Sequence, residues 1–389
     1  MHTLTPDVQG FMYPNEVQLT WSVLIVLYPF ITGLVAGAFI LASLARVFNI
    51  AAVQPIYRLS LLTALAFLLV APLPLQLHLG HPERSFEMYM TPHRTSAMAM
   101  FGFVYLWYLL AVLLLEIWLD YRRDFVLSAR SRTGVTKWIY SALTLGSRNI
   151  DAKSLHVDDR VGWVVTLIGI TSAFLLHGYV GFIFGSVKAN PWWSTPLMPV
   201  VFIFSAMVSG IAVVLLVYQT ASYLRKRPVD MACLDMVAKY LLYIFLIDFS
   251  LEMLDLVHRM YEASESFRTL DFMVHTQLYM SQIVLQIVLG TLFPIGILAL
   301  VQVVKPGEML RRRVYTLAAA LTLIGIFAMR WNVVIGGQLF SKSFLGYTTY
   351  KMAFAAREGL LPAIALLILP LLILWGLLKL LPPWEEQKV

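Results

Sequence analysis

Nine long apolar stretches run through this chain of 389 residues, and they constrain its fold more than any other feature. A helix crosses a bilayer core with about 20 predominantly apolar residues. The stretches lie near residues 20–47, 56–79, 97–120, 161–186, 197–224, 236–258, 275–303, 313–335 and 358–381. An open sheet would leave backbone groups unpaired in lipid. The sequence therefore predicts an all-α, polytopic membrane protein with about nine transmembrane helices.

The basic residues predict how the chain is oriented. Most of the 29 lysines and arginines fall on the side that holds the long connection 121–160 and the C-terminus. By the positive-inside rule this side is cytoplasmic, so we expect a multi-pass protein of the cell membrane with its N-terminus outside. A basic surface against the lipid bilayer accounts for the net charge of +7 without nucleic acid as a partner.

The apolar stretches suggest an internal repeat within one integral membrane domain, 1–389. The first and fifth stretches both have tryptophan at their entry and continue with small residues, which let helices approach closely. We expect a first four-helix bundle over 1–186, with a cytoplasmic loop at 121–160, a second over 197–335, and an additional helix at 358–381. The chain has a single cysteine, Cys233, which excludes an iron–sulfur cluster ligated by cysteines of this chain alone.

The sixth stretch carries acidic residues at helical spacing. Asp248, Glu252 and Asp255, followed by Arg259, stand at steps of four, three and four and share one helical face. Charged groups inside a membrane are costly, so this face points into the bundle or a wet cavity. The stripe is either a proton-exchanging relay that lines a site or a structural network paired with arginines on other helices.

Histidines and amides gather at the same depth as the carboxylates. His177 and Arg330 lie late in their stretches, and His78 and His81 follow the second stretch. A quinone pocket needs hydrogen-bond donors, a titratable neighbour and an apolar slot, which this combination supplies. Haem ligation by His177 and His258 is an alternative. A secondary transporter is a third, although the polar groups lie away from the midplane where its site would be.

The loops resemble those of a known family. The run 77–84, Leu-His-Leu-Gly-His-Pro-Glu-Arg, resembles the signature of the polysulfide-reductase membrane-subunit (NrfD-like) family, and 92–98 follows as it does there. The runs 33–39 and 177–210 also fit. The run 330–338 is similar to a longer branch, which includes the membrane subunits of quinone-linked uptake hydrogenases and of the sulfite-reductase-associated transmembrane complex.

The resemblance implies a subunit that binds no haem or iron–sulfur cluster itself and works only within a membrane redox complex. It implies a site for menaquinone or another quinone near the outer face, and an extracytoplasmic, ferredoxin-like iron–sulfur partner subunit. We expect the pocket between the first, second, fourth and sixth stretches, and we predict no metal site. The residues expected to act in catalysis are Asp248, Glu252, Asp255 and His177, and those expected to bind the quinone are Tyr28, His78, His81, Glu83, Arg84 and Arg330. Glu83 and Arg84 are equally suited to bracing their loop.

Overall fold

The computed structural model describes residues 6–262 and 266–384, and these are helical almost throughout. The two short strands in this part of the chain are β1 (Gln9–Gly10) and β2 (Gly346–Tyr347). The helices are α1 (Val23–Arg46), α2 (Tyr57–Val70), α3 (Leu73–His78), α4 (Glu87–Met90), α5 (Ala97–Trp107), α6 (Leu115–Ser131), α7 (Gly134–Leu143), α8 (Ala152–Gly185), α9 (Met198–Leu224), α10 (Met231–Glu262), α11 (Phe267–His275), α12 (Phe293–Val304), α13 (Glu308–Val334) and α14 (Leu360–Leu380).

Eight helical spans in the described ranges are long and apolar enough to cross a membrane. They are Val23–Arg46, Ala51–His78, Ala99–Ser131, Ala152–Gly185, Met198–Leu224, Tyr279–Val304, Glu308–Gln338 and Leu360–Leu380. The sixth predicted stretch coincides with α10, which has 32 residues but carries the acidic stripe. The predicted all-α, polytopic membrane protein is confirmed.

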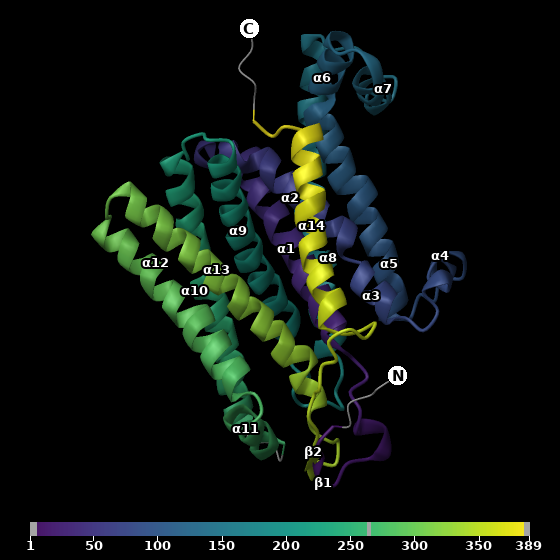
Figure 1. Cartoon of the computed structure of the whole chain (residues 1–389), viewed down its shortest axis with the longest axis vertical. Coiled ribbons are helices and arrows are strands. Elements are labelled where there is room, and N and C mark those ends of the chain that lie inside the picture. Colours follow the sequence, from purple (N-terminus) through teal and green to yellow (C-terminus); the bar gives the residue numbers. More distant parts are fainter. Residues whose placement is uncertain (1–5, 263–265, 385–389) are drawn as a thin grey trace.

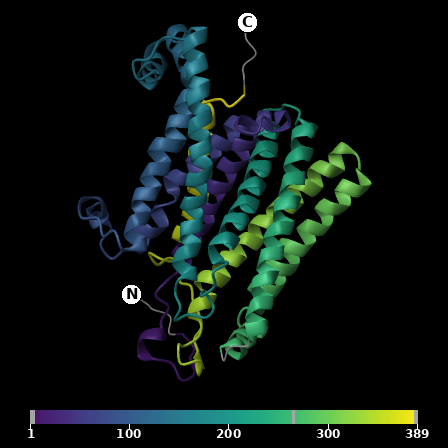
Figure 2. The same ribbon diagram turned by 180° about the vertical axis from the view of Figure 1, so that it is seen from behind.

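The helices form one bundle with two distinct ends (Figure 1). The lower end in Figure 1 carries β1, β2 and α11, and α4 lies beyond the lower end of α5; we call this side the sheet face. The opposite end carries α7 and is called the α7 face; Figure 2 shows the same arrangement from behind. β1 pairs antiparallel with β2, with Gln9 opposite Tyr347. This pairing ties the N-terminal segment to the connection between α13 and α14.

Helix α1 lies at the centre of the bundle and packs on α2, α8, α9 and α13. Its apolar window is 94% buried, whereas that of α14 is 22% buried. The small residues of α1 and α9 permit their close contact. A Cβ on Gly37 would stand 2.1 Å from the carbonyl oxygen of Ala206 and 2.8 Å from Cα of Gly210. The small-residue patches therefore act as predicted, by bringing two helices into backbone contact.

The long connection 121–160 is largely helical rather than a loop. Helix α6 continues to Ser131, α7 follows, and α8 begins at Ala152. Arg122 explains why this segment is ordered, because its buried guanidinium pairs with Asp158 and donates to Oγ of Ser147 and Ser154. One arginine thereby holds the end of α6 against the start of α8.

Two of the membrane spans contain π-helical segments, η4 (Tyr108–Leu114) and η5 (Tyr279–Leu292). Such wider turns are uncommon and frequently occur at functional sites. η5 carries Gln282 and Gln286, and η4 ends just before Glu116. Both segments thus place polar side chains inside the bundle.

Candidate functional site

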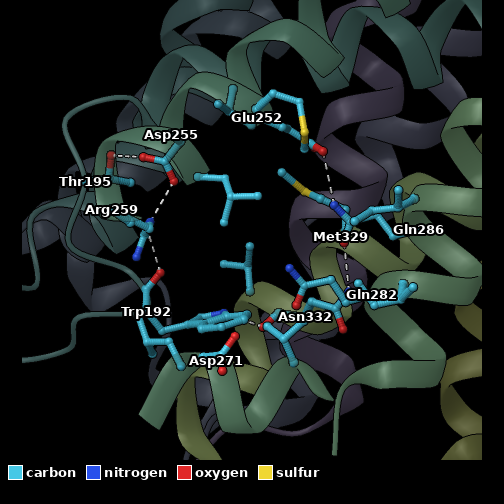
Figure 3. A pocket seen from close by; sticks show the side chains of 18 of the residues that line it. Trp192, Thr195, Glu252, Asp255, Arg259, Asp271, Gln282, Gln286, Met329 and Asn332 are labelled. Carbon is cyan, nitrogen blue, oxygen red and sulfur yellow. Dashed lines mark hydrogen bonds and ion pairs between the residues drawn. The ribbon is translucent and has the colours of Figure 1, made fainter. Parts of the chain in front are cut away.

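A cavity of about 400 Å³ opens at the sheet face among α9, α10, α11, η5 and α13. This volume is within the usual range for a small-molecule site. Apolar side chains form much of the wall, among them Met198, Val201, Leu256, Ile283, Ile287 and Met329. Polar groups also line it: Glu252, Asp255, Arg259, Asp271, Gln282, Gln286 and Asn332 (Figure 3).

Asp255 and Arg259 join α10 to the segment that precedes α9. The Asp255 carboxylate pairs with Nε of Arg259 at 2.8 Å and accepts from the Thr195 hydroxyl at 2.5 Å. Arg259 also donates to the backbone carbonyls of Pro191 and Trp192. The Trp192 indole in turn donates to the carbonyl of Asn332 near the end of α13, where helix carbonyls lack intrahelical partners. Asp255 therefore has a bracing function at the mouth of the cavity.

Glu252 lies deeper and begins a chain of amide contacts. Its Oε2 accepts from Nε2 of Gln286 at 3.3 Å, and Oε1 of Gln286 accepts from Nδ2 of Asn332 at 2.8 Å. The Ser281 hydroxyl completes the chain by donating to Oδ1 of Asn332 at 2.5 Å. Gln282 also lines the cavity, and its Oε1 is buried without a hydrogen-bond partner in the described part of the chain. The wall thus holds the oriented carboxylate of Glu252 and the amide oxygen of Gln282, which is free to accept a hydrogen bond from a ligand.

Asp248 lies on α10 one turn before Glu252, behind the cavity wall. Its side chain is buried, and its Oδ1 has no hydrogen-bond partner within residues 6–262 and 266–384. Asp248 and Glu252 interact electrostatically with each other and with the buried Arg330 of α13. The guanidinium therefore offsets the charge of two carboxylates inside the bundle, as groups of this kind require in a membrane.

Arg330 continues the buried polar chain to α8 and α1. Its Nη2 lies 3.0 Å from Nε2 of His177 and donates to Oγ of Ser205 at 2.7 Å. Nδ1 of His177 lies 3.3 Å from Oγ1 of Thr32. The guanidinium carbon stands 4.0 Å from the ring centre of Phe202, which also stacks on His177. Both nitrogens of His177 thus face partners, an arrangement that does not favour haem ligation by this histidine.

A comparison of the sequence with models of protein families identifies the family of the chain that contains this site. The model of the family described as polysulphide reductase, NrfD, matches residues 13–342. The chain belongs to the NrfD family. The matched range includes the cavity and the whole buried chain from Glu252 to Thr32.

Relatives of this NrfD-family chain include components of named reductases. A selenate reductase subunit of Mesobacillus selenatarsenatis is 34% identical over 204 residues, 51% of this chain and 48% of that protein. A putative dimethyl sulfoxide reductase membrane subunit of Halobacterium salinarum is 30% identical over 199 residues, which are 51% of this chain and 42% of that protein. Protein NrfD of Escherichia coli is 28% identical over 207 residues, which are 51% of this chain and 59% of that protein. The matches span about half the length of these relatives.

The loop that resembles the NrfD signature lies at the sheet face, outside the cavity wall. His78 pairs with Glu358 at 2.9 Å and joins α3 to the segment before α14. His81 pairs with Glu83 on the surface. Arg84 pairs with Glu87, and this contact lowers the pKa of the Glu87 carboxyl. These contacts fit the bracing interpretation of the loop, and a role in quinone binding stays a prediction.

The ten predicted site residues of this NrfD-family protein thus separate into distinct groups. Glu252 and Asp255 line the cavity, while Asp248, His177 and Arg330 form the chain behind it. Tyr28 is buried in α1, edge-on to Phe101. The signature loop holds the other four, His78, His81, Glu83 and Arg84. The cavity therefore lies beside α9, α10, η5 and α13, whereas we expected a pocket among the first, second, fourth and sixth stretches.

Some residues of the NrfD-family site were not identified from sequence. Thr32 contacts His177, and Ser281 orients Asn332. Hydroxyl residues are frequent in apolar helices, where they bond to their own backbone, as Thr32 does to the carbonyl of Tyr28. Only the position of a partner on another helix distinguishes them, and the sequence pattern does not contain it.

Proposed function

We propose that this chain is the quinone-reactive membrane subunit of a respiratory oxidoreductase complex. It exchanges electrons between menaquinol, or a similar quinol, and an extracytoplasmic iron–sulfur subunit. The observation that carries the proposal is the cavity at the sheet face, since its wall combines an apolar slot with amide and carboxylate groups. Membership of the NrfD family and relatives named as reductase subunits support it.

The groups on the cavity wall fit a quinol. The buried, unpartnered Oε1 of Gln282 is able to accept from a hydroxyl, and amide nitrogens of the same wall suit a carbonyl. Met198, Val201 and Met329 provide the apolar surface for a ring and the start of a tail. A bound quinol supplies two electrons and two protons on oxidation. The chain's own task is therefore to bind and orient the quinol and to accept its protons.

In our proposal Glu252 takes the first proton. Its carboxylate faces the cavity and is held in place by Gln286, a geometry that suits a general base. Asp248 extends the acidic path inward, and Arg330 offsets the negative charge while Glu252 is ionised. His177 keeps the Arg330 guanidinium in position. Asp255 is paired with Arg259 and serves to hold the mouth open to the sheet face.

The proposed orientation places the sheet face outside the cell membrane and the α7 face in the cytoplasm. The positive-inside rule supports it, because α6, α7 and the segment that follows α9 carry many of the arginines and lysines. The iron–sulfur subunit then docks over the cavity mouth and the signature loop. Tyr28, His78, His81, Glu83 and Arg84 remain predicted contacts for the quinone or for that partner.

We further propose that 1–186 and 197–335 are two copies of one four-helix repeat, with the helix near 358–381 added. Equivalent features support this division. The first helix of each copy contributes a glycine, Gly37 and Gly210, to one close contact. The third span of each copy contains a π-helical segment, η4 and η5.

Filling the cavity tests the function. Ile283 of η5 lines the cavity, and Leu289 on the same segment is exposed on the outer surface of the helices. In the purified complex, we expect Ile283→Trp to abolish quinol-dependent reduction of the partner and Leu289→Trp to preserve it. Both variants should assemble with the partner subunits, as judged by copurification. Equal turnover in an assembled Ile283→Trp complex would refute the cavity as the quinol site.

A further inference from the structure

A second buried carboxyl lies in the other half of the bundle, well apart from the cavity at the sheet face. Glu116 of α6 is fully buried, and the structure describes no ion pair for it. Its Oε2 has no hydrogen-bond partner among the residues that the structure describes. The hydroxyl of Tyr108, also fully buried and unpartnered, interacts electrostatically with Glu116. Two buried polar atoms without partners in one span indicate a place where a proton or water enters.

The other oxygen of Glu116 has partners suited to both charge states of the acid. Oε1 lies 3.1 Å from the Tyr57 hydroxyl and 2.5 Å from the Thr166 hydroxyl. Thr166 also lies 2.9 Å from the carbonyl of Gly162 and has a single hydrogen to donate. When Glu116 is ionised, Thr166 donates to it. When Glu116 is protonated, it donates to Thr166, which turns its own hydrogen to Gly162.

A polar cavity at the α7 face reaches Tyr57, whose hydroxyl contacts Glu116. It has a volume of about 930 Å³, and Arg46, Tyr57, Arg58, Asp120 and Asp159 contribute to its wall. The side chain of Asp159 is 84% exposed, that of Arg46 is 12% exposed, and Glu116 is fully buried. Exposure thus falls stepwise from the surface to the acid.

Charges on α1, α2, α6 and α8 set the potential at this position. Arg46 of α1 donates to the Tyr57 hydroxyl at 2.6 Å and lies 3.6 Å from Asp120 of α6. Arg58 of α2 pairs with Asp120 and Asp124, and Asp159 of α8 approaches Arg46 at 4.0 Å. The site also depends on a glycine in α8. A Cβ on Gly162 would stand 2.0 Å from Nη2 of Arg46, so a larger residue there would displace the guanidinium from its present position.

We propose that Glu116 is a proton-binding site loaded from the cavity at the α7 face. A hydronium ion in the cavity gives its proton to the Glu116 carboxylate and leaves as water, with the Tyr57 hydroxyl as the group between them. Arg46 does not carry the proton, because a guanidinium stays protonated in proteins. It fixes the Tyr57 hydroxyl instead. The chain then holds acids that open to opposite faces of the membrane.

Infrared difference spectroscopy of the complex in oriented proteoliposomes tests this assignment without turnover. We expect a carboxylic acid C=O band that is absent in Glu116→Gln and that disappears reversibly when the pH on the α7 side is raised. Tyr57→Phe should slow this exchange at least tenfold. Tyr105→Phe is the matched control, since Tyr105 donates to the carbonyl of Leu68 outside this cluster.

Three outcomes would overturn the assignment. A Glu116 band that persists at every pH would make the acid a permanently neutral structural group. The lack of any such band would make it permanently ionised. A band that responds only to the pH at the sheet face would place its proton source on the wrong side. None of these results depends on whether the sheet-face cavity binds a quinol, so the two proposals succeed or fail separately.

Discussion

Arg330 and His177, fully buried on different helices, share a hydrogen bond of 3.0 Å between Nη2 and Nε2. Arginine only donates, so Nε2 must accept, and the imidazole is neutral with its hydrogen on Nδ1. That hydrogen points to Oγ1 of Thr32. The histidine thus acts as an acceptor that holds a cation in place beside two carboxylates.

The loss of stability on replacing His177 should depend on whether the new side chain accepts a hydrogen bond from Arg330. In His177→Leu, Arg330 loses an acceptor inside the bundle, and we expect the free energy of unfolding to fall by about 1.5–3 kcal/mol. His177→Gln keeps a carbonyl oxygen and should lose less. Denaturant unfolding in detergent measures both. Equal losses would show that packing against Phe202, rather than the hydrogen bond, is what His177 provides.

Loss of Arg259 should loosen the segment before α9. Arg259→Gln removes the pair with Asp255 and the contacts to the carbonyls of Pro191 and Trp192. We expect faster hydrogen exchange at residues 190–195, followed by mass spectrometry. Asp271→Asn is the control, since Asp271 lines the same cavity but pairs with His275 on its own helix. Unchanged exchange in Arg259→Gln would contradict the bracing function.

Glu252→Gln should reduce turnover while binding persists. The amide preserves shape but no longer accepts a proton, and loss of a general base costs about 10²- to 10⁴-fold in rate. We expect kcat for quinol-dependent reduction to fall within that range with little change in KM. Glu262→Gln, at the exposed end of the same helix, should be neutral. Full activity in Glu252→Gln would remove this residue from the proton path.

A methyl group at the contact of α1 with α9 should destabilise the bundle. Gly37→Ala would force its Cβ against the Ala206 carbonyl, an overpacking that costs about 1–3 kcal/mol. A Cβ on Gly376 of α14 would project into open space beside the described residues, so Gly376→Ala should leave stability unchanged or raised. Thermal unfolding of both variants checks the difference. Comparable melting temperatures of the two variants would mean that α1 and α9 can move apart at little cost in free energy.

The pH dependence at the signature loop follows from Glu87. The hydrogen bonds from Arg84 lower its pKa in the folded protein, so its stabilising contribution is present above the unfolded pKa. It is lost as the pH falls through the lower, folded value. Titration of the Glu87 carboxyl carbon by NMR should show the lowered pKa, and Arg84→Gln should return it to the ordinary range. High salt should weaken the effect, because both side chains are exposed.

The sequence predicts the membrane spans well because length and apolar composition alone determine which segments cross a bilayer. It also places Glu252 and Asp255 on one face of α10, since helical spacing is a local property. The cavity beside η5 and the brace from Asp255 to Thr195 depend on which helices pack together, and this information is not local. Glu116 escaped notice for a related reason, because it stands near the polar end of its stretch and resembles an interfacial residue.

The pairing of β1 with β2 has a consequence for biosynthesis. The N-terminal strand leaves the ribosome long before Gly346 and Tyr347 are made, so it waits unpaired while the intervening helices insert. The two-stranded sheet closes only when the segment ahead of α14 arrives. α14 itself lies largely exposed on the outside of the bundle, and the segment ahead of it is thus held by residues that were translated long before it.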